Sequence, residues 1–276
     1  MSMSINTNSS ALNALQNLNI TNRDLDKTQL RVNTGLEVRN AKDNAAVYAI
    51  AQNLRANKQG LEAVKQSLDR SISAVDIALA ASEAIADILI QMKEKVVAAA
   101  DAGLDAQSRS ALQEDFNSLR DQITTMVNNA EFNGINLIDG NGDQVSAIVN
   151  ANATQNISIA HQSLSLGSSN ISLGAASTFT TATEAQSLIS VIDSSIKNVS
   201  SVMTVLGAGS RSMELQRLFV NKLSDTIETG IGNLVDADLA RESARLQALQ
   251  VKQRLGVQAL SIANSQPQVI LGLFGN

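Results

Sequence analysis

A single histidine is the side chain best suited to acid–base chemistry in this 276-residue sequence. His161 could accept a proton from a serine hydroxyl, but a catalytic triad also needs an acidic residue that orients the imidazole. No acidic residue stands beside His161 in the sequence. The absence of cysteine excludes thiolate nucleophiles and cysteine-bound metals. We therefore predict that His161 is a solvated histidine of a hairpin and that the chain has no catalytic residue.

Two further patterns resemble ligand sites but lack essential members. Asp139-x-Asn141-x-Asp143 opens like a calcium-binding loop, yet Gln144 replaces the glycine and Asn150 replaces the glutamate of such a loop. Gly207-Ala-Gly209 lacks the third glycine of a dinucleotide-binding loop and lies inside a helical pattern. The first pattern predicts a tight turn, and we expect neither a metal nor a cofactor.

The charge balance and the apolar runs exclude two classes of partner. Lys and Arg number 21 against 26 Asp and Glu, for a formal net charge of −5, with no basic cluster that could neutralise nucleic-acid phosphates. No run of about 18 apolar residues exists that could span a membrane. The first residues also lack the basic and apolar segments of a secretory signal peptide. We expect no nucleic-acid binding, no membrane insertion and no cleaved signal peptide.

The elements around these residues read mainly as long helices. Aromatic residues make up 2% of the chain and proline occurs once, which favours helices over sheets. Between positions 54 and 100, apolar residues recur at the seven-residue spacing of helices that pack side by side. Gly103 is expected to end this helix and Asp105 to cap the next. The first set of the repeat is Leu54, Leu61, Leu68, Val75, Ser82, Leu89 and Val96.

The pattern changes to period two in a β region from about 131 to 180. We predict short strands at 156–159, 163–166 and 170–173, where apolar and polar residues alternate. Thr181 and Glu184 have the spacing of a capping box that opens a second long helix. Gly230-Ile-Gly232 is expected to interrupt that helix, and a last helix is expected from about Asp236. The fold class is therefore mainly α, a long antiparallel helical bundle or coiled coil with one small β-hairpin region.

The two chain ends carry leucine-rich stripes on short helices that are marginal in water when isolated. Pairing the ends with each other, and with copies from other chains, would bury both stripes. Intramolecular packing alone would explain any single stripe equally well. The predicted assembly residues are Ile5, Leu12, Leu15, Leu18, Leu25, Leu30, Leu239, Leu246, Leu249, Val257, Leu260, Ala263, Leu271 and Leu273.

Two segments, in the expected order, resemble the terminal signatures of bacterial flagellins. The N-terminal match runs from Asn33 to Ala46, and the C-terminal matches run from Leu234 to Glu242 and from Gln258 to Leu271. Glu131-Phe-Asn-Gly134 is similar to the family's junction between helix and hairpin. The resemblance implies a spoke motif that comprises Gly35, Arg39, Ala41, Asp43, Asn44, Ala45 and Ala46.

This resemblance implies a structural, non-enzymatic subunit that polymerises into the bacterial flagellar filament, the propeller for swimming. Residues 1–36 and 236–276 would form a discontinuous filament-core domain, 37–54 a spoke or linker, and 55–235 a helical rod. The outer domains of longer flagellins would be missing. Implied partners are further copies, paralogous flagellins, an export chaperone, and cap or junction proteins, outside the cell after type III export.

Departures from the family pattern carry two more expectations. Gln91 and Lys93 stand where arginine is usual, and Lys95 replaces an apolar residue, in a patch that a Toll-like receptor recognises in many flagellins. Because lysine lacks arginine's planar fork, we predict weak recognition. Some members carry O-linked sugars, for which the exposed hydroxyls here would be those of Ser163, Ser165, Thr178, Thr180, Thr181 and Thr183.

Two alternatives remain on the sequence alone. A flagellar hook–filament junction protein shares the terminal helices but makes only a short collar. A secreted helical scaffold or effector could use the same stripes to bind a partner helix. Growth of copies into long polymers would separate the filament subunit from both.

Overall fold

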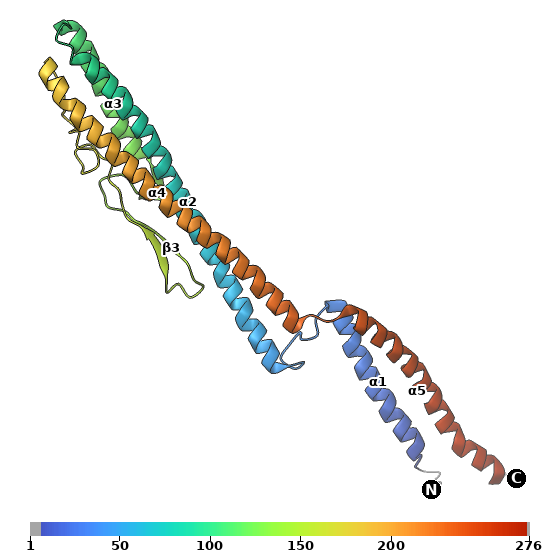
Figure 1. The fold of residues 1–276 in the computed structure, drawn as a ribbon. Coiled ribbons are helices and arrows are strands. Elements are labelled where there is room, and N and C mark those ends of the chain that lie inside the picture. Colours follow the sequence, from blue (N-terminus) through green and yellow to red (C-terminus); the bar gives the residue numbers. More distant parts are fainter. Residues whose placement is uncertain (1–6, 275–276) are drawn as a thin grey trace. The chain divides into compact units, whose positions relative to one another are not determined.

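The computed structural model describes residues 7–274, and the side chains of residues 7–265. Over this range the chain forms five helices: α1 (Ser9–Thr34), α2 (Ala45–Ala99), α3 (Ala106–Asn129), α4 (Ala182–Val235) and α5 (Leu239–Phe274). Four short strands lie between α3 and α4 (Figure 1): β1 (Glu131–Phe132), β2 (Ile135–Asn136), β3 (Val145–Ile148) and β4 (Asn156–Ile159). The predicted mainly α fold with a small β region is confirmed. None of the described helices has the length and apolar character needed to cross a membrane.

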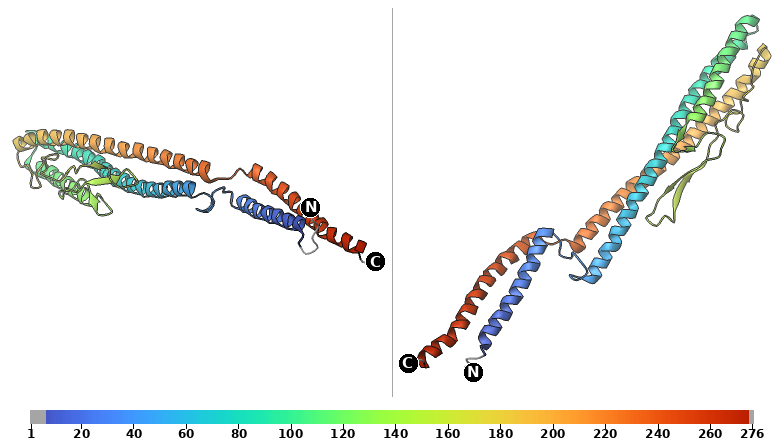
Figure 2. Two further views of the ribbon diagram at one scale, coloured as in Figure 1. Left: turned by 90° about the horizontal axis from the view of Figure 1, so that it is seen from below. Right: turned by 180° about the vertical axis from the view of Figure 1, so that it is seen from behind.

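The chain divides into two compact units. The terminal unit comprises residues up to Arg55 and from Ile227 onward, and the central unit comprises Ala56–Thr226. In the central unit α2, α3 and α4 lie side by side in every view (Figures 1 and 2). Their shared core contains the predicted seven-residue repeat of α2, which is buried from Leu61 to Val96. Facing it are Phe116 and Ile123 of α3 and, from α4, Ile192, Val199, Leu206, Met213 and Val220, all fully buried.

Capping side chains determine where the helices of the central unit begin. Asp105 caps α3, since its Oδ1 accepts hydrogen bonds from the backbone N–H groups of Gln107 and Ser108. Thr181 and Glu184 form the predicted capping box: the Glu184 Oε2 accepts from the Thr181 N–H at 3.1 Å, and the Thr181 hydroxyl accepts from the Glu184 N–H at 3.3 Å. Both predicted caps are confirmed.

The expected interruption at Gly230-Ile-Gly232 is wrong, because α4 continues to Val235. Each glycine weakens a helix by about 1 kcal/mol, but Ile231 packs against the buried cluster of Val38, Ala51 and Val235. This packing offsets the weak propensity. The chain leaves the helix only after Val235, and α5 begins at Leu239 rather than near Asp236.

The β region forms two separate antiparallel pairs. Phe132 pairs with Ile135 in a tight turn, and Val145 pairs with Ile159 in the β3–β4 hairpin. The strands predicted at 163–166 and 170–173 are wrong, although Leu164, Ile171 and Leu173 are buried as the alternation required. These segments are anchored by isolated backbone hydrogen bonds, such as Leu164 N–H to Ile138 O at 2.7 Å, and do not form ladders. The alternation of buried and exposed residues in these segments therefore does not come from strand pairing.

Candidate assembly surface at the chain ends

In the terminal unit α1 and α5 pair along their lengths in an antiparallel arrangement (Figures 1 and 2). Three contacts fix the direction. Asn8 Nδ2 donates to the Ala263 carbonyl at 2.7 Å, Gln253 Nε2 donates to Asn22 Oδ1 at 2.8 Å, and Arg31 Nη1 donates to Glu242 Oε1 at 2.8 Å. The start of one helix thus lies against the later part of the other.

Both ends of α1 are capped by residues suited to that role. Asn8 is the N-cap, and its side-chain oxygen accepts a hydrogen bond from the Ala11 N–H at 3.0 Å. Gly35 ends the helix with φ of 70° and donates its N–H to the Arg31 carbonyl. This left-handed conformation explains why a glycine begins the spoke motif.

Several predicted assembly residues lie in the seam between the two helices. Leu25 and Leu249 are buried, while Leu18, Leu246, Leu260 and Ala263 are half-buried. Thr21 and Thr28 are also buried in the seam. The prediction did not include them because it considered only apolar residues. The regular spacing of 18, 21, 25 and 28 is the sequence signal that could have found them.

The other predicted assembly residues point away from the seam. Their side chains are largely exposed to solvent: Leu12 is 61% exposed, Leu15 44%, Leu30 43%, Leu239 49% and Val257 54%. Sequence reasoning missed Ile20, Val251, Leu255 and Ile262, which are exposed in the same way. Ile5 lies outside the described residues, and of Leu271 and Leu273 only the backbone, in α5, is described.

On α1 the exposed apolar side chains are interspersed with exposed polar ones, such as Gln16, Arg23 and Lys27, whereas the seam side is lined by Leu18 and Leu25. Large exposed apolar patches on soluble chains mark sites of protein association. The two helices therefore present outward faces with the chemistry of an interface, whereas the seam is already filled within one chain.

The spoke motif folds into a compact turn in the terminal unit. The Arg39 N–H donates to Asp43 Oδ2 at 3.2 Å, and the Arg39 guanidinium lies 3.4 Å from the same oxygen. Burial alone would raise the pKa of Asp43, but the Arg39 hydrogen bond and charge outweigh it and hold the pKa below its ordinary value. Asn44 Oδ1 accepts from the Val47 N–H at the start of α2, while Ala41, Ala45 and Ala46 are exposed.

Backbone hydrogen bonds join this turn to the segment between α4 and α5. The N–H groups of Glu37 and Val38 donate to the Val235 carbonyl, and the Ala237 N–H donates to the Gly35 carbonyl. Tyr48 packs against the apolar cluster of Val38, Ala51 and Val235. The two chain ends are therefore tied together in the terminal unit.

The structure corrects the reading of His161. The residue lies beyond the end of β4 and its side chain is 21% exposed, so it is not a solvated hairpin histidine. Its Nε2 lies 2.6 Å from the Asp139 carbonyl oxygen and 3.8 Å from Asp139 Oδ1. Asp139 is therefore the acidic residue near His161, and sequence reasoning did not find it because it is not adjacent in the sequence. As predicted, the segment that begins at Asp139 forms a turn, in which the Asp139 Oδ1 accepts a hydrogen bond from the Asn141 N–H. No group of His, Cys, Asp and Glu suited to hold a metal occurs among the described residues.

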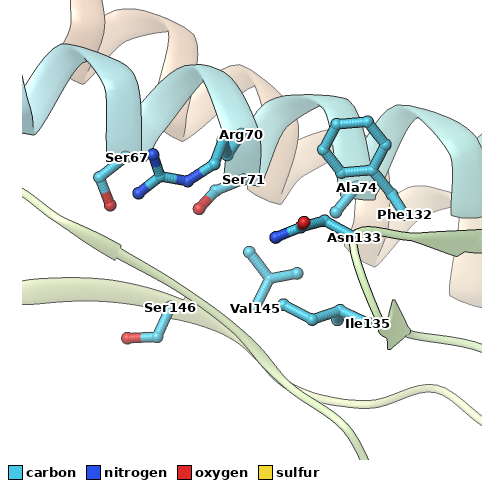
Figure 3. A pocket seen from close by; sticks show the side chains of 9 residues that line it. All are labelled: Ser67, Arg70, Ser71, Ala74, Phe132, Asn133, Ile135, Val145 and Ser146. Atoms are coloured by element: carbon cyan, nitrogen blue, oxygen red, sulfur yellow. The ribbon is translucent and has the colours of Figure 1, made fainter.

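A cavity of about 220 Å³ lies between α2 and the strands of the central unit (Figure 3). Ser67, Arg70 and Ser71 of α2 form one wall of the cavity, and Asn133 and Val145 lie on the other side. The remaining lining residues are Ala74, Phe132, Ile135 and Ser146. Its lining contains neither histidine nor carboxylate, so this cavity lacks the groups needed for general acid–base chemistry.

The residues predicted to bear on receptor recognition and on sugars have defined partners. Lys93 is 2.7 Å from Asp193 and Lys95 is 2.9 Å from Asp115, and the Asp115 hydrogen bond raises the pKa of Lys95. Of the predicted sugar acceptors, Ser163 and Ser165 are half-buried and Thr178 bonds to Gln113. Thr180 and Thr181 bond to Glu184, and Thr183 is exposed.

Comparisons with known proteins match both ends of the chain to one family. Residues 5–143 match the bacterial flagellin N-terminal helical region, and residues 189–274 match the bacterial flagellin C-terminal helical region. Flagellin FljM of Caulobacter vibrioides is 48% identical over 98% of both chains. A flagellin of Brucella melitensis is 35% identical over 98% of this chain and 99% of its own. A proposed flagellar hook-associated protein of Vibrio parahaemolyticus, 14% identical, has a similar fold, with a TM-score of 0.56 over 70% of this chain and all of that one.

Proposed function

Because the chain belongs to the bacterial flagellin family and is a subunit of the flagellar filament, we propose that copies join through the outward faces of α1 and α5. One observation carries this proposal. Large apolar side chains on both helices are exposed in the single chain, between 43% for Leu30 and 65% for Ile262. Contact with neighbouring copies would remove these side chains from water, which is the main driving force of most protein association.

The proposal assigns roles to the parts of the chain. Residues 1–36 and 236–276 form the filament core, 37–54 form the spoke, and 55–235 form a rod with its β region at about 131–180. The limit of the terminal unit at Arg55 supports the boundary between spoke and rod. The spoke residues Gly35, Arg39 and Asp43 hold the turn that separates α1 from α2.

Substitution of two outward leucines tests the proposal. Leu12→Gln with Leu15→Gln keeps helix propensity and leaves the seam intact, but makes part of the outward face polar. We expect seeded polymerisation, measured by sedimentation, to be lost or reduced at least about tenfold, since burying each leucine is worth about 1.5–3 kcal/mol.

The matched control is Leu12→Met with Leu15→Met, which conserves volume and apolar character. This control should polymerise like the parent chain. Normal polymerisation of the glutamine variant, at the same seed concentration, would refute the role of the outward face.

We also propose that the chain has no enzymatic activity. The flagellin family is structural, and the His161 ring is engaged by the backbone of a turn, where its contact is with a carbonyl oxygen. His161→Ala should leave filament growth unchanged. Any substrate turnover that this substitution abolishes would contradict the proposal.

The partner proposals rest on the family resemblance. For such a subunit, which acts outside the cell, we expect export without a cleaved signal peptide and with the help of an export chaperone. We also expect a cap protein as a partner and paralogous flagellins in the same filament. Toll-like receptor recognition should be weak, because Lys93 and Lys95 are engaged with Asp193 and Asp115 and cannot present arginine's fork. Strong receptor activation by depolymerised protein would contradict this.

The sugar proposal concerns Ser163, Ser165, Thr178, Thr180, Thr181 and Thr183. Thr183 fits best, since it is exposed on the first turn of α4. The intact mass of native filament protein decides the matter: a mass equal to that of the sequence would remove the proposal.

A further inference from the structure

Asparagine followed by glycine occurs twice in the sequence, at Asn133-Gly134 and at Asn141-Gly142. This pair is chemically labile, because glycine has no side chain to shield its backbone nitrogen from the amide carbon of the preceding asparagine. All four residues are exposed. The structure nevertheless gives the two pairs different surroundings, so their reactivity should differ.

Asn133 and Gly134 form the two-residue turn between β1 and β2, in which Phe132 pairs with Ile135. Their φ angles are 52° and 83°, and positive values at both central positions are typical of a type I′ turn, for which Asn-Gly is a preferred sequence. The turn therefore explains why a labile pair occurs here. The ladder behind it consists of two residue pairs, so local opening that lets the chain rotate at Asn133 costs little free energy.

The side-chain amides of the two asparagines differ in their hydrogen bonds. Asn141 is held by Asp139: its backbone N–H donates to Asp139 Oδ1 at 2.8 Å, and its Nδ2 donates to Asp139 Oδ2. The Asn133 amide makes no hydrogen bond to any residue that the structure describes. It can therefore turn toward the Gly134 nitrogen without breaking a contact, whereas the Asn141 amide must first leave Asp139.

The charges near the two amides also differ. Asn133 and Arg70 line the same cavity of about 220 Å³ (Figure 3), and neither Glu131 nor any other carboxylate belongs to that lining. Arg70 has no ion-pair partner among the described residues. The Asn141 amide, in contrast, contacts the Asp139 carboxylate. Since attack by the glycine nitrogen builds up negative charge, a guanidinium nearby favours the reaction and a carboxylate nearby disfavours it.

We propose that Asn133 is a site of spontaneous deamidation and that Asn141 is protected from the same reaction. The Gly134 nitrogen loses its proton to hydroxide and bonds to the side-chain carbonyl carbon of Asn133. The bond from that carbon to the amide nitrogen breaks, and this nitrogen leaves as ammonia with a proton from water. Water then opens the resulting succinimide ring on either side of its nitrogen. The net reaction consumes one water, releases one ammonia and transfers no electrons.

The two ring-opening products affect the turn differently. Aspartate keeps the turn, because Asp-Gly also fits type I′ geometry, and it adds a carboxylate to a cavity lining that has Arg70 but no acid. Isoaspartate routes the main chain through the side-chain carbon. This adds one atom to the backbone of a two-residue turn, so the β1–β2 pairing should be lost. Because no enzyme is needed, the modified fraction should rise with the age of the protein.

Peptide mapping of the full chain by tandem mass spectrometry, after storage at neutral pH, tests the proposal. We expect Asn133 to convert at least about tenfold faster than Asn141 in the folded protein. In concentrated urea, where neither turn persists, the two rates should agree within about threefold. A protease that cleaves at aspartate but not at isoaspartate distinguishes the two products. Asn133→Gln should abolish the faster conversion, since glutamine would have to form a larger ring.

The contribution of Arg70 has its own test. Arg70→Met should slow the conversion of Asn133 at least about threefold at low ionic strength, where the charge is least screened. The matched control is Arg211→Met, which removes an exposed arginine outside the cavity lining and should leave both rates unchanged.

Equal rates at the two asparagines in the folded chain, or faster conversion of Asn141, would overturn the proposal. A tenfold ratio that persists in urea would overturn it too, because the difference would then come from the sequence alone. An unchanged Asn133 rate in the Arg70→Met chain would overturn the part assigned to Arg70. These results do not depend on filament growth, so they are independent of the proposed function.

Discussion

Glu184 closes the first turn of α4 by accepting hydrogen bonds from the N–H groups of Thr180 and Thr181 and from the Thr180 hydroxyl. The backbone hydrogen bond from Thr180 is the main reason that the pKa of Glu184 lies below its ordinary value. A carboxylate whose pKa is lowered by folding stabilises the fold above its unfolded pKa. That contribution disappears as the pH falls through the folded pKa.

Glu184→Gln should therefore lower the melting temperature at about pH 7 and lose this effect in acid. Because the parent carboxylate becomes protonated there, the difference between parent and variant should shrink as the pH falls from about 5 to about 3. Circular dichroism melts across this range measure it, with Glu83→Gln as a control for the loss of one exposed charge. An equal difference at both ends of the range would contradict the role of the cap.

Gly207 and Gly209 lie two positions apart in α4 but in different surroundings. A Cβ at Gly207 would meet nothing within 4 Å, whereas one at Gly209 would collide with the side chain of Ile159 at the end of β4. Gly207→Ala should stabilise the central unit by about 0.5–1 kcal/mol through helix propensity, while Gly209→Ala should destabilise it by about 1–3 kcal/mol through overpacking.

Urea unfolding of the two alanine variants measures this contrast. Adding Ile159→Ala to Gly209→Ala should cost less than the sum of the single changes, since the colliding atoms are removed. Equal effects of the two glycine substitutions would show that the hairpin does not press on α4 at this point.

At the scale of elements, the long helices were predictable because their apolar spacing extends over many turns. Caps such as Asp105 and Thr181 were predictable too, since a short side chain can satisfy the free N–H groups only at such positions. The strands at 163–166 and 170–173 were not, because local alternation says nothing about whether a partner strand exists. The continuation of α4 through Gly230 depends on packing with Val38 and Ala51, which are far away in sequence.

The site could be predicted only in part for the same reason. Leucine spacing identifies both terminal helices, but it does not divide their leucines between the seam and the outward face. That division becomes visible only with the contacts between residues more than two hundred positions apart, such as Arg31 with Glu242 and Asn22 with Gln253.

Leu260 tests the pairing of α1 and α5 as elements. Leu260→Asp places a charge in the half-buried seam and should cost several kcal/mol of pairing free energy. We expect polymerisation to be lost, while the central unit stays helical because its core is untouched. Leu260→Met is the control that should behave like the parent. Normal filaments of the aspartate variant would contradict the seam.

At the scale of the whole molecule, both units have a filled interior and exposed apolar side chains, the latter including Leu215, Leu218 and Phe219 of the central unit. The central unit buries its apolar stripes among α2, α3 and α4, with the Phe116 and Phe179 rings 5.4 Å apart in an edge-to-face arrangement. The terminal unit fills its seam but leaves the outward faces of α1 and α5 exposed. Under the proposed function, neighbouring copies complete the burial of the chain ends.

The most direct test is amide hydrogen exchange of the same protein as monomer and as filament, with filaments melted by heat and regrown from seeds. We expect slow exchange in α2, α3 and α4 in both states. In α1 and α5, exchange should be fast in the monomer and slower by at least about a hundredfold in the filament, because the pair fills only its seam until neighbouring copies pack on it. Equal exchange of α1 and α5 in monomer and filament would contradict assembly through the chain ends.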